Sequence, residues 1–169
     1  IASLMFMKKI GDLTAERSDV KSLDEEAWAD EKGFPKNLKE EVLAVRQKCG
    51  VFDVSHMGQV LLRGASWDAV ARGFETLVPV DVLGLGDGRQ RYGFFTNDTG
   101  GIEDDLMFAR RGEDLLVVVN AACKEADIER MRAALEPDIS VEVLTDRALV
   151  ALQGPKAVDV LSRLDPHAA

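Results

Sequence analysis

Apolar residues recur at helical spacing in four segments of the chain. The clearest segment follows Ser66, a favourable N-cap residue, and places Trp67, Val70, Phe74 and Leu77 on one stripe. Such a stripe predicts a helix that packs one side against a core. By the same reasoning, helices are expected at 37–48, from 66 to about 77, at 125–135 and from 154 to about 164.

Shorter runs between these segments have the composition and alternation that are typical of strands. Strands are expected at 60–62, continuing a segment that begins near Phe52, and at 90–96, 102–108, 115–120, 139–144 and 148–152. The short turn at 111–113 favours antiparallel pairing of its flanking strands. This order of elements predicts an α+β fold, with antiparallel or mixed sheets and covering helices.

A turn followed by two acids is the most informative local pattern. Residues 97–101 read Asn-Asp-Thr-Gly-Gly, which predicts a tight reversal because these residues tolerate positive φ. In the strand that follows, alternation places Asp104 on the side of Leu106 and places Asp105 on the other side. The acids are either solvated turn residues or, where a partner compensates burial, ligand-binding groups. A β-bulge after Gly101 would exchange their faces.

Antiparallel pairing across the turn at 111–113 brings Asn120 back toward the two acids. An asparagine side chain presents both donors and an acceptor, which suits the polar edge of a heterocycle. The alternative is that Asn120 caps the helix that follows, and one residue could do both.

Composition and charge narrow the function class. The chain has 169 residues, which is enough for one domain or one and part of another, and its net charge of −9 argues against nucleic-acid binding. No apolar run reaches the roughly 18–20 residues that span a bilayer, so no membrane association is expected. The two histidines are far apart, and Cys49 and Cys123 form no CxxC pair. The sequence therefore predicts no metal site, no disulfide framework and a reducing, cytoplasmic compartment.

Five short segments, in this order and spacing, resemble one known family. They are FDVSHMG at 52–58, Arg91-Tyr92, GGIEDDL at 100–106, VVNAA at 118–122 and Leu152 to Pro155. The combination is similar to the first half of the tetrahydrofolate-dependent aminomethyltransferases, the T-proteins of the glycine cleavage system, over roughly 43–164. Residues 1–36 depart from that family, since they hold isolated Trp28 and Phe34 in place of its apolar stretch. We therefore expect a divergent segment at 1–36 of uncertain structure and a folate-binding aminomethyltransferase-like domain at 37–169.

The resemblance implies an activity and a set of residues. The family transfers a one-carbon unit from an aminomethyl-lipoyl arm to tetrahydrofolate and releases ammonia. Its partner is a lipoyl-bearing carrier protein, the H-protein. By the family motif Asp105 is the catalytic acid, and the expected folate contacts are Met57, Tyr92, Asp104, Val119 and Asn120.

The resemblance also implies that a family member is about twice as long as this chain. The chain is then a first-half fragment, a split subunit completed by a second chain, or a shortened relative. Other expectations remain open: a folate-binding accessory module of the iron–sulfur assembly type, a folate-dependent demethylase or oxidase subunit, and a degenerate interaction domain. Both the SHMG and DDL motifs are present, which favours the transferase.

Overall fold

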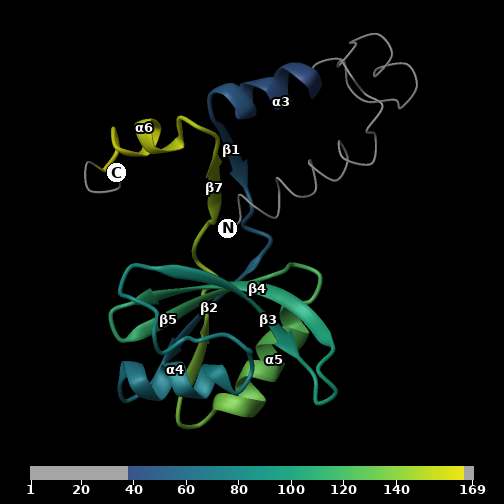
Figure 1. Cartoon of the computed structure of the whole chain (residues 1–169), viewed down its shortest axis with the longest axis vertical. Coiled ribbons are helices and arrows are strands. Elements are labelled where there is room, and N and C mark those ends of the chain that lie inside the picture. The colour runs from purple at the N-terminus through teal and green to yellow at the C-terminus, as the bar shows by residue number, and fades with distance from the viewer. Residues whose placement is uncertain (1–37, 166–169) are drawn as a thin grey trace. The chain divides into compact units, whose positions relative to one another are not determined.

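A computed structural model of the protein describes residues 38–165, and the chain divides into two compact units (Figure 1). One unit comprises residues 54–149. The other combines 38–53 with 150–165 among the described residues. Each unit has its own sheet.

The larger unit is a five-stranded antiparallel sheet covered by two helices. The strand order is β3-β4-β5-β2-β6. Figure 1 shows both helices on the same side of this sheet. The strands are β2 (Gly58–Arg63), β3 (Gln90–Thr96), β4 (Ile102–Arg111), β5 (Asp114–Val119) and β6 (Ser140–Val143), and the helices are α4 (Trp67–Glu75) and α5 (Lys124–Leu135).

The hydrophobic core lies between the sheet and these helices. Alternate residues of each strand point toward α4 and α5, so residues such as Val60, Phe108 and Val117 are almost fully buried. Phe74 of α4 packs edge-on against Phe95 and Phe108, with ring centroids 6.3 and 5.5 Å away. The packing of these rings fixes α4 on the sheet.

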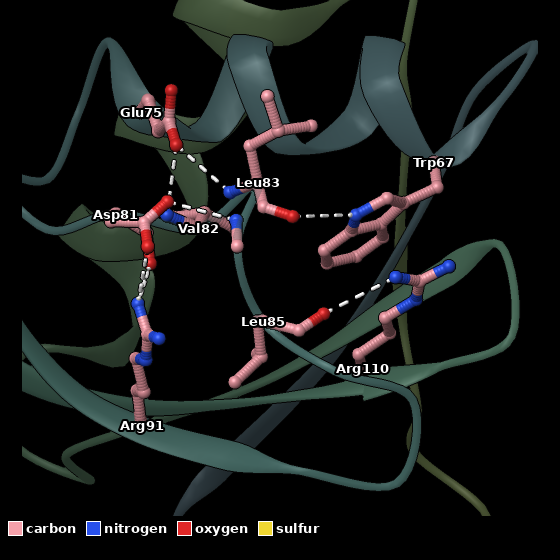
Figure 2. Close-up of polar contacts among 9 residues, drawn as sticks. Trp67, Glu75, Asp81, Val82, Leu83, Leu85, Arg91 and Arg110 are labelled. Atoms are coloured by element: carbon pink, nitrogen blue, oxygen red, sulfur yellow. Dashed lines mark hydrogen bonds and ion pairs between the residues drawn. The ribbon is translucent and has the colours of Figure 1, made fainter.

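Side chains from the neighbouring elements hold the long loop 76–89 in place (Figure 2). The Glu75 carboxylate at the end of α4 accepts hydrogen bonds from the backbone N–H groups of Val82 and Leu83, both at 2.8 Å. Further contacts in Figure 2 run from the Trp67 indole N–H to the Leu83 carbonyl, from Arg110 to the Leu85 carbonyl, and from Arg91 to Asp81. Polar groups that would otherwise be costly to bury are thus paired.

The smaller unit is a two-stranded antiparallel ribbon with two helices. It contains α3 (Leu38–Gln47), β1 (Gly50–Asp53), β7 (Val150–Gln153) and α6 (Ala157–Leu161). After β7 the chain turns at Gly154, whose φ is +123°, a conformation that favours glycine. A Cβ there would lie 2.5 Å from the carbonyl oxygen of Val45 and 2.6 Å from that of Lys48.

The predicted α+β class with antiparallel sheets is confirmed, and the corrections concern how segments join. The segment at Phe52 does not continue into β2, because the chain turns at 54–57, where the Met57 N–H bonds the Val54 carbonyl. The two strands therefore join different sheets. The last helix is shorter than expected and begins after Pro155.

Two further predictions concern residues that the structure does not describe or describes only in part. Trp28, Phe34 and the rest of the divergent segment at 1–36 lie outside residues 38–165. Within that range, no helix combines the length and the apolar character needed to cross a bilayer.

The ring cluster yields a stability prediction. Phe74→Ala should lower the free energy of unfolding by about 3–5 kcal/mol, because it removes a fully buried ring from between two others. Arg72→Ala, on the exposed side of the same helix, serves as the control and should change stability by less than about 0.5 kcal/mol. Urea denaturation followed by circular dichroism measures both, and equal effects would contradict this description of the core.

Candidate functional site

The predicted turn forms and launches β4. The Asn97 side-chain oxygen accepts hydrogen bonds from the N–H groups of Thr99 at 3.1 Å and Gly101 at 2.8 Å, and Gly100 has a φ of +79°. A bulge lies just beyond, since Phe95 pairs with Asp104 while Thr96 pairs with Ile102. The turn thus fixes where the regular part of β4 begins.

The bulge does not exchange the faces of the two acids. Beyond it, Asp104 keeps the side of Leu106, which is buried under the helices. Asp105 lies on the opposite side, where its strand partner is Phe94 and where Tyr92 and Met107 also lie. Alternation therefore placed Asp104 correctly on the more apolar face, where its Oδ2 atom is buried, and the adjacent acids belong to different faces of the sheet.

Both oxygens of Asp105 accept hydrogen bonds. The Tyr92 hydroxyl donates to one oxygen, and the Asn120 side-chain nitrogen donates to the other at 2.7 Å. Tyr92 is 39% exposed and Asp105 is half-buried, so this group lies at an accessible surface of the unit. Two donors from neighbouring strands hold the carboxylate in one orientation.

Asn120 follows the last paired residue of β5 and contacts both acids. Its nitrogen lies 3.0 Å from Asp104 Oδ1 and also 3.0 Å from the Asp105 carbonyl oxygen. The predicted return of Asn120 toward the acids is confirmed. The alternative role as a helix cap is wrong, because Cys123 is the N-cap of α5 and its side chain makes no capping bond.

Asp127 completes an acidic cluster that the sequence analysis did not identify. It lies on the buried side of α5, is only 4% exposed, and is within hydrogen-bonding reach of Asp104. Burial, followed by the hydrogen bond and the charge of Asp104, raises the pKa of Asp127 from 3.8 to about 7. The signal was present in the sequence: Asp127 is four residues before Met131, which lies on the apolar stripe of the same helix.

The same acids act on a neighbouring thiol. Cys123 lies beside Asp104, and the negative charge of Asp104, with burial and a hydrogen bond to the same acid, raises the pKa of the Cys123 thiol. A thiol held in its protonated form is a poor nucleophile. Cys123 is therefore part of the surroundings of Asp104 rather than a candidate reactive group.

The side chains of two expected contact residues, Val119 and Met57, do not join the Tyr92–Asp105–Asn120 group. The Val119 side chain is fully buried in the core, so only its backbone could meet a ligand. Met57 is half-buried and lines a cavity of about 390 Å³, together with Gln59 and basic residues including Lys124 and Arg147. Neither Asp104 nor Asp105 lines this cavity.

No cluster of three His, Cys, Asp or Glu side chains suited to hold a metal ion occurs within residues 38–165. Asp104 and Asp105 instead accept hydrogen bonds from the uncharged side chains of Asn120 and Tyr92.

Comparison with known families supplies the identification. Residues 13–169 match the family described as the GCVT N-terminal domain, which is more than half of the chain. The chain belongs to this family. The predicted relationship to T-proteins is thereby confirmed.

Relatives of this GCVT domain are aminomethyltransferases. The chain is 38% identical over 138 residues to the mitochondrial aminomethyltransferase of Dictyostelium discoideum, covering 77% of this chain and 34% of that protein. It is 44% identical over 131 residues to the aminomethyltransferase of Synechococcus sp. strain RCC307, covering 75% and 35%. The chain thus spans about a third of the length of these relatives.

A solved structure shows the same fold. The GCVT domain matches the crystal structure of glycine cleavage system aminomethyltransferase T from Bartonella henselae, with a TM-score of 0.67 and 33% sequence identity. The match covers 73% of this chain and 34% of that one.

The buried acid of α5 predicts a distinctive pH profile. Because the folded pKa of Asp127 exceeds the unfolded value of about 3.9, its ionisation disfavours folding, and its destabilising effect grows from about pH 4 to pH 7. Asp127→Asn removes this effect. The variant should therefore gain on the order of 2–4 kcal/mol relative to the wild type between pH 4 and 7, with a constant difference above that range.

Urea denaturation at a series of pH values measures this difference. Asp138→Asn, the same chemical change at an exposed position, is the matched control and should give a profile parallel to that of the wild type. A profile of Asp127→Asn that also runs parallel to the wild type would contradict the burial and pairing of Asp127.

Proposed function

We propose that this GCVT domain takes part in aminomethyl transfer from a lipoyl-bearing carrier protein to tetrahydrofolate, with release of ammonia. The observation that carries the proposal is the fixed Asp105 carboxylate, held by Tyr92 and Asn120 at an accessible face of the sheet. The aminomethyltransferase relatives support this assignment over an accessory or demethylase role.

The residues around Asp105 fit a reduced pterin. Tyr92, Phe94 and Met107 are partly exposed and share the face of Asp105, so a flat ring finds apolar surface beside hydrogen-bonding groups. The nitrogen of Asn120 is engaged by the acids, which leaves its carbonyl oxygen directed elsewhere. Asp105 and Asn120 can therefore form hydrogen bonds with the polar edge of the pterin ring, and Tyr92 can contact the side of the ring.

Bound tetrahydrofolate supplies the nitrogen that accepts the one-carbon unit. Asp105 takes up the proton that this nitrogen loses, at a carboxylate oxygen that retains a free lone pair. Tyr92 and Asn120 keep the carboxylate aimed while the proton moves. The negative charge of Asp105 also stabilises positive charge that develops beside it.

The chain spans about a third of the length of its relatives. We infer that further polypeptide contributes folate contacts on the side of the sheet that carries Asp105. The net charge of −9 does not attract the anionic tail of folate, so the folate site must be locally less negative than the chain as a whole. Met57, which lines a separate cavity, stays a proposed folate contact on the strength of the family motif.

Replacement of Asp105 tests the proposal. Asp105→Asn should lower the rate of aminomethyl transfer by roughly 10²–10⁴-fold, because the amide cannot take up the proton. The rate is measured as ammonia release. The chain is mixed with a polypeptide that corresponds to the two thirds of an aminomethyltransferase relative that this chain does not span. Calorimetry measures tetrahydrofolate binding to the chain with and without that polypeptide.

Asp98→Asn is the matched control, since Asp98 is an exposed acid of the preceding turn. It should leave both transfer and binding at wild-type values. Transfer that persists at the wild-type rate in Asp105→Asn would show that another group carries the reaction.

A further inference from the structure

Within residues 38–165, two buried carboxylate oxygens have no hydrogen-bond partner. They are Oδ2 of Asp104 and Oδ2 of Asp127. The two carboxyl groups lie within hydrogen-bonding reach of each other, one on β4 and one on α5. Two ionised carboxylates in that position would repel and leave both oxygens unsatisfied, whereas one shared proton bonds them together.

Among the described residues, no Lys or Arg forms an ion pair with Asp104 or Asp127, and the charges that act on Asp127 are those of Asp104 and Asp105. The Arg130 guanidinium of α5 is paired with Glu103 of β4. From the segment between β5 and α5 come the Asn120 amide and the Cys123 thiol. Among the described residues, an ionised Asp127 would thus add a third negative charge beside Asp104 and Asp105.

The amide of Asn120 connects this buried pair to the opposite face of the sheet. Its nitrogen carries two hydrogens for three acceptors: Asp104 Oδ1 at 3.0 Å, Asp105 Oδ1 at 2.7 Å and the Asp105 carbonyl oxygen at 3.0 Å. Asp104 Oδ1 can accept the Asn120 hydrogen bond only while that oxygen carries no proton. A proton on Asp127 leaves Asp104 Oδ1 free to accept, whereas a proton on Asp104 Oδ1 would displace the amide hydrogen.

We propose that Asp127 carries the proton of an Asp104–Asp127 acid pair, and that this pair fixes the Asn120 amide and through it the orientation of Asp105. Asp127 is thus a positioning residue, located on the helix side of the sheet while the reacting group lies on the other side. Its effect on ligand binding rests on the proposed function, but its effect on Asn120 does not.

The first test needs no ligand. In the ¹⁵N-labelled chain, the Asn120 side-chain amide resonances should shift with a midpoint near pH 7 as the pair loses its proton. Asp127→Asn should abolish this titration and keep the amide at its low-pH position, because its own N–H replaces the proton permanently. Asp138→Asn should leave the titration unchanged.

Two further variants keep this test decisive. Asp127→Ala removes the donor altogether, so the Asn120 resonances should be displaced or broadened at every pH. Asp104→Asn removes the negative charge beside Asp127 but keeps an amide oxygen as acceptor, so it should move the Asn120 titration to lower pH, which provides a second measurement if Asp127→Asn does not fold. An Asn120 titration that persists in Asp127→Asn, or resonances that do not titrate in the wild type, would overturn the proposal.

The second test uses tetrahydrofolate. Wild-type affinity should weaken about tenfold between pH 6 and pH 8.5, whereas Asp127→Asn should keep the affinity measured at pH 6 over the whole range. A merely structural role would lower affinity in the variant without changing its pH profile, and that result would overturn the link to the site. Failure of the proposed function gives a different result. Asp105→Asn would then keep full transfer activity, while the Asn120 amide of the wild type would still titrate and that of Asp127→Asn would not.

Discussion

The site depends on one requirement: carboxyl groups that lose contact with water must find hydrogen-bond donors within the protein. Packing of α5 against the sheet excludes water from Asp127 and from one oxygen of Asp104. A buried acid without a partner is costly, so the few donors within reach determine which arrangement is stable. Asn120 supplies two of these donors from one nitrogen. The packing of α5 against the sheet therefore both forms the core of the unit and determines how its aspartates are arranged.

Asn120 owes this role to its place in the chain. A side chain within a strand points to one face of the sheet or the other, and neighbours such as Asp104 and Asp105 are separated in this way. Asn120 lies one residue beyond the last paired position, Val119, and its amide can reach acids of both faces. The end of a strand is thus where two otherwise insulated surfaces of a sheet can be coupled.

Local periodicity predicted much of this architecture, and its failures have physical reasons. The helix at Trp67, the strand from Gln90 and the return of Asn120 followed from spacing and turn chemistry. The break at 54–57 was missed because both flanking segments are apolar and extended, and only their different partners separate them. Asp127 was missed because a polar residue in a helix reads as exposed until the packing of that helix is known. The position of the cavity beside Met57 depends on side chains from distant segments, which no local pattern reveals.

The close approach at Gly154 has a consequence for the smaller unit. The carbonyls of Val45 and Lys48 occupy the space where any other residue would carry its first side-chain carbon, and the Lys156 N–H bonds the same Lys48 carbonyl at 2.9 Å. The end of α3 and the exit of the β1–β7 ribbon are therefore joined backbone to backbone. Any other residue at position 154 would force these carbonyls to move, so the close approach of α3 to the ribbon depends on this glycine.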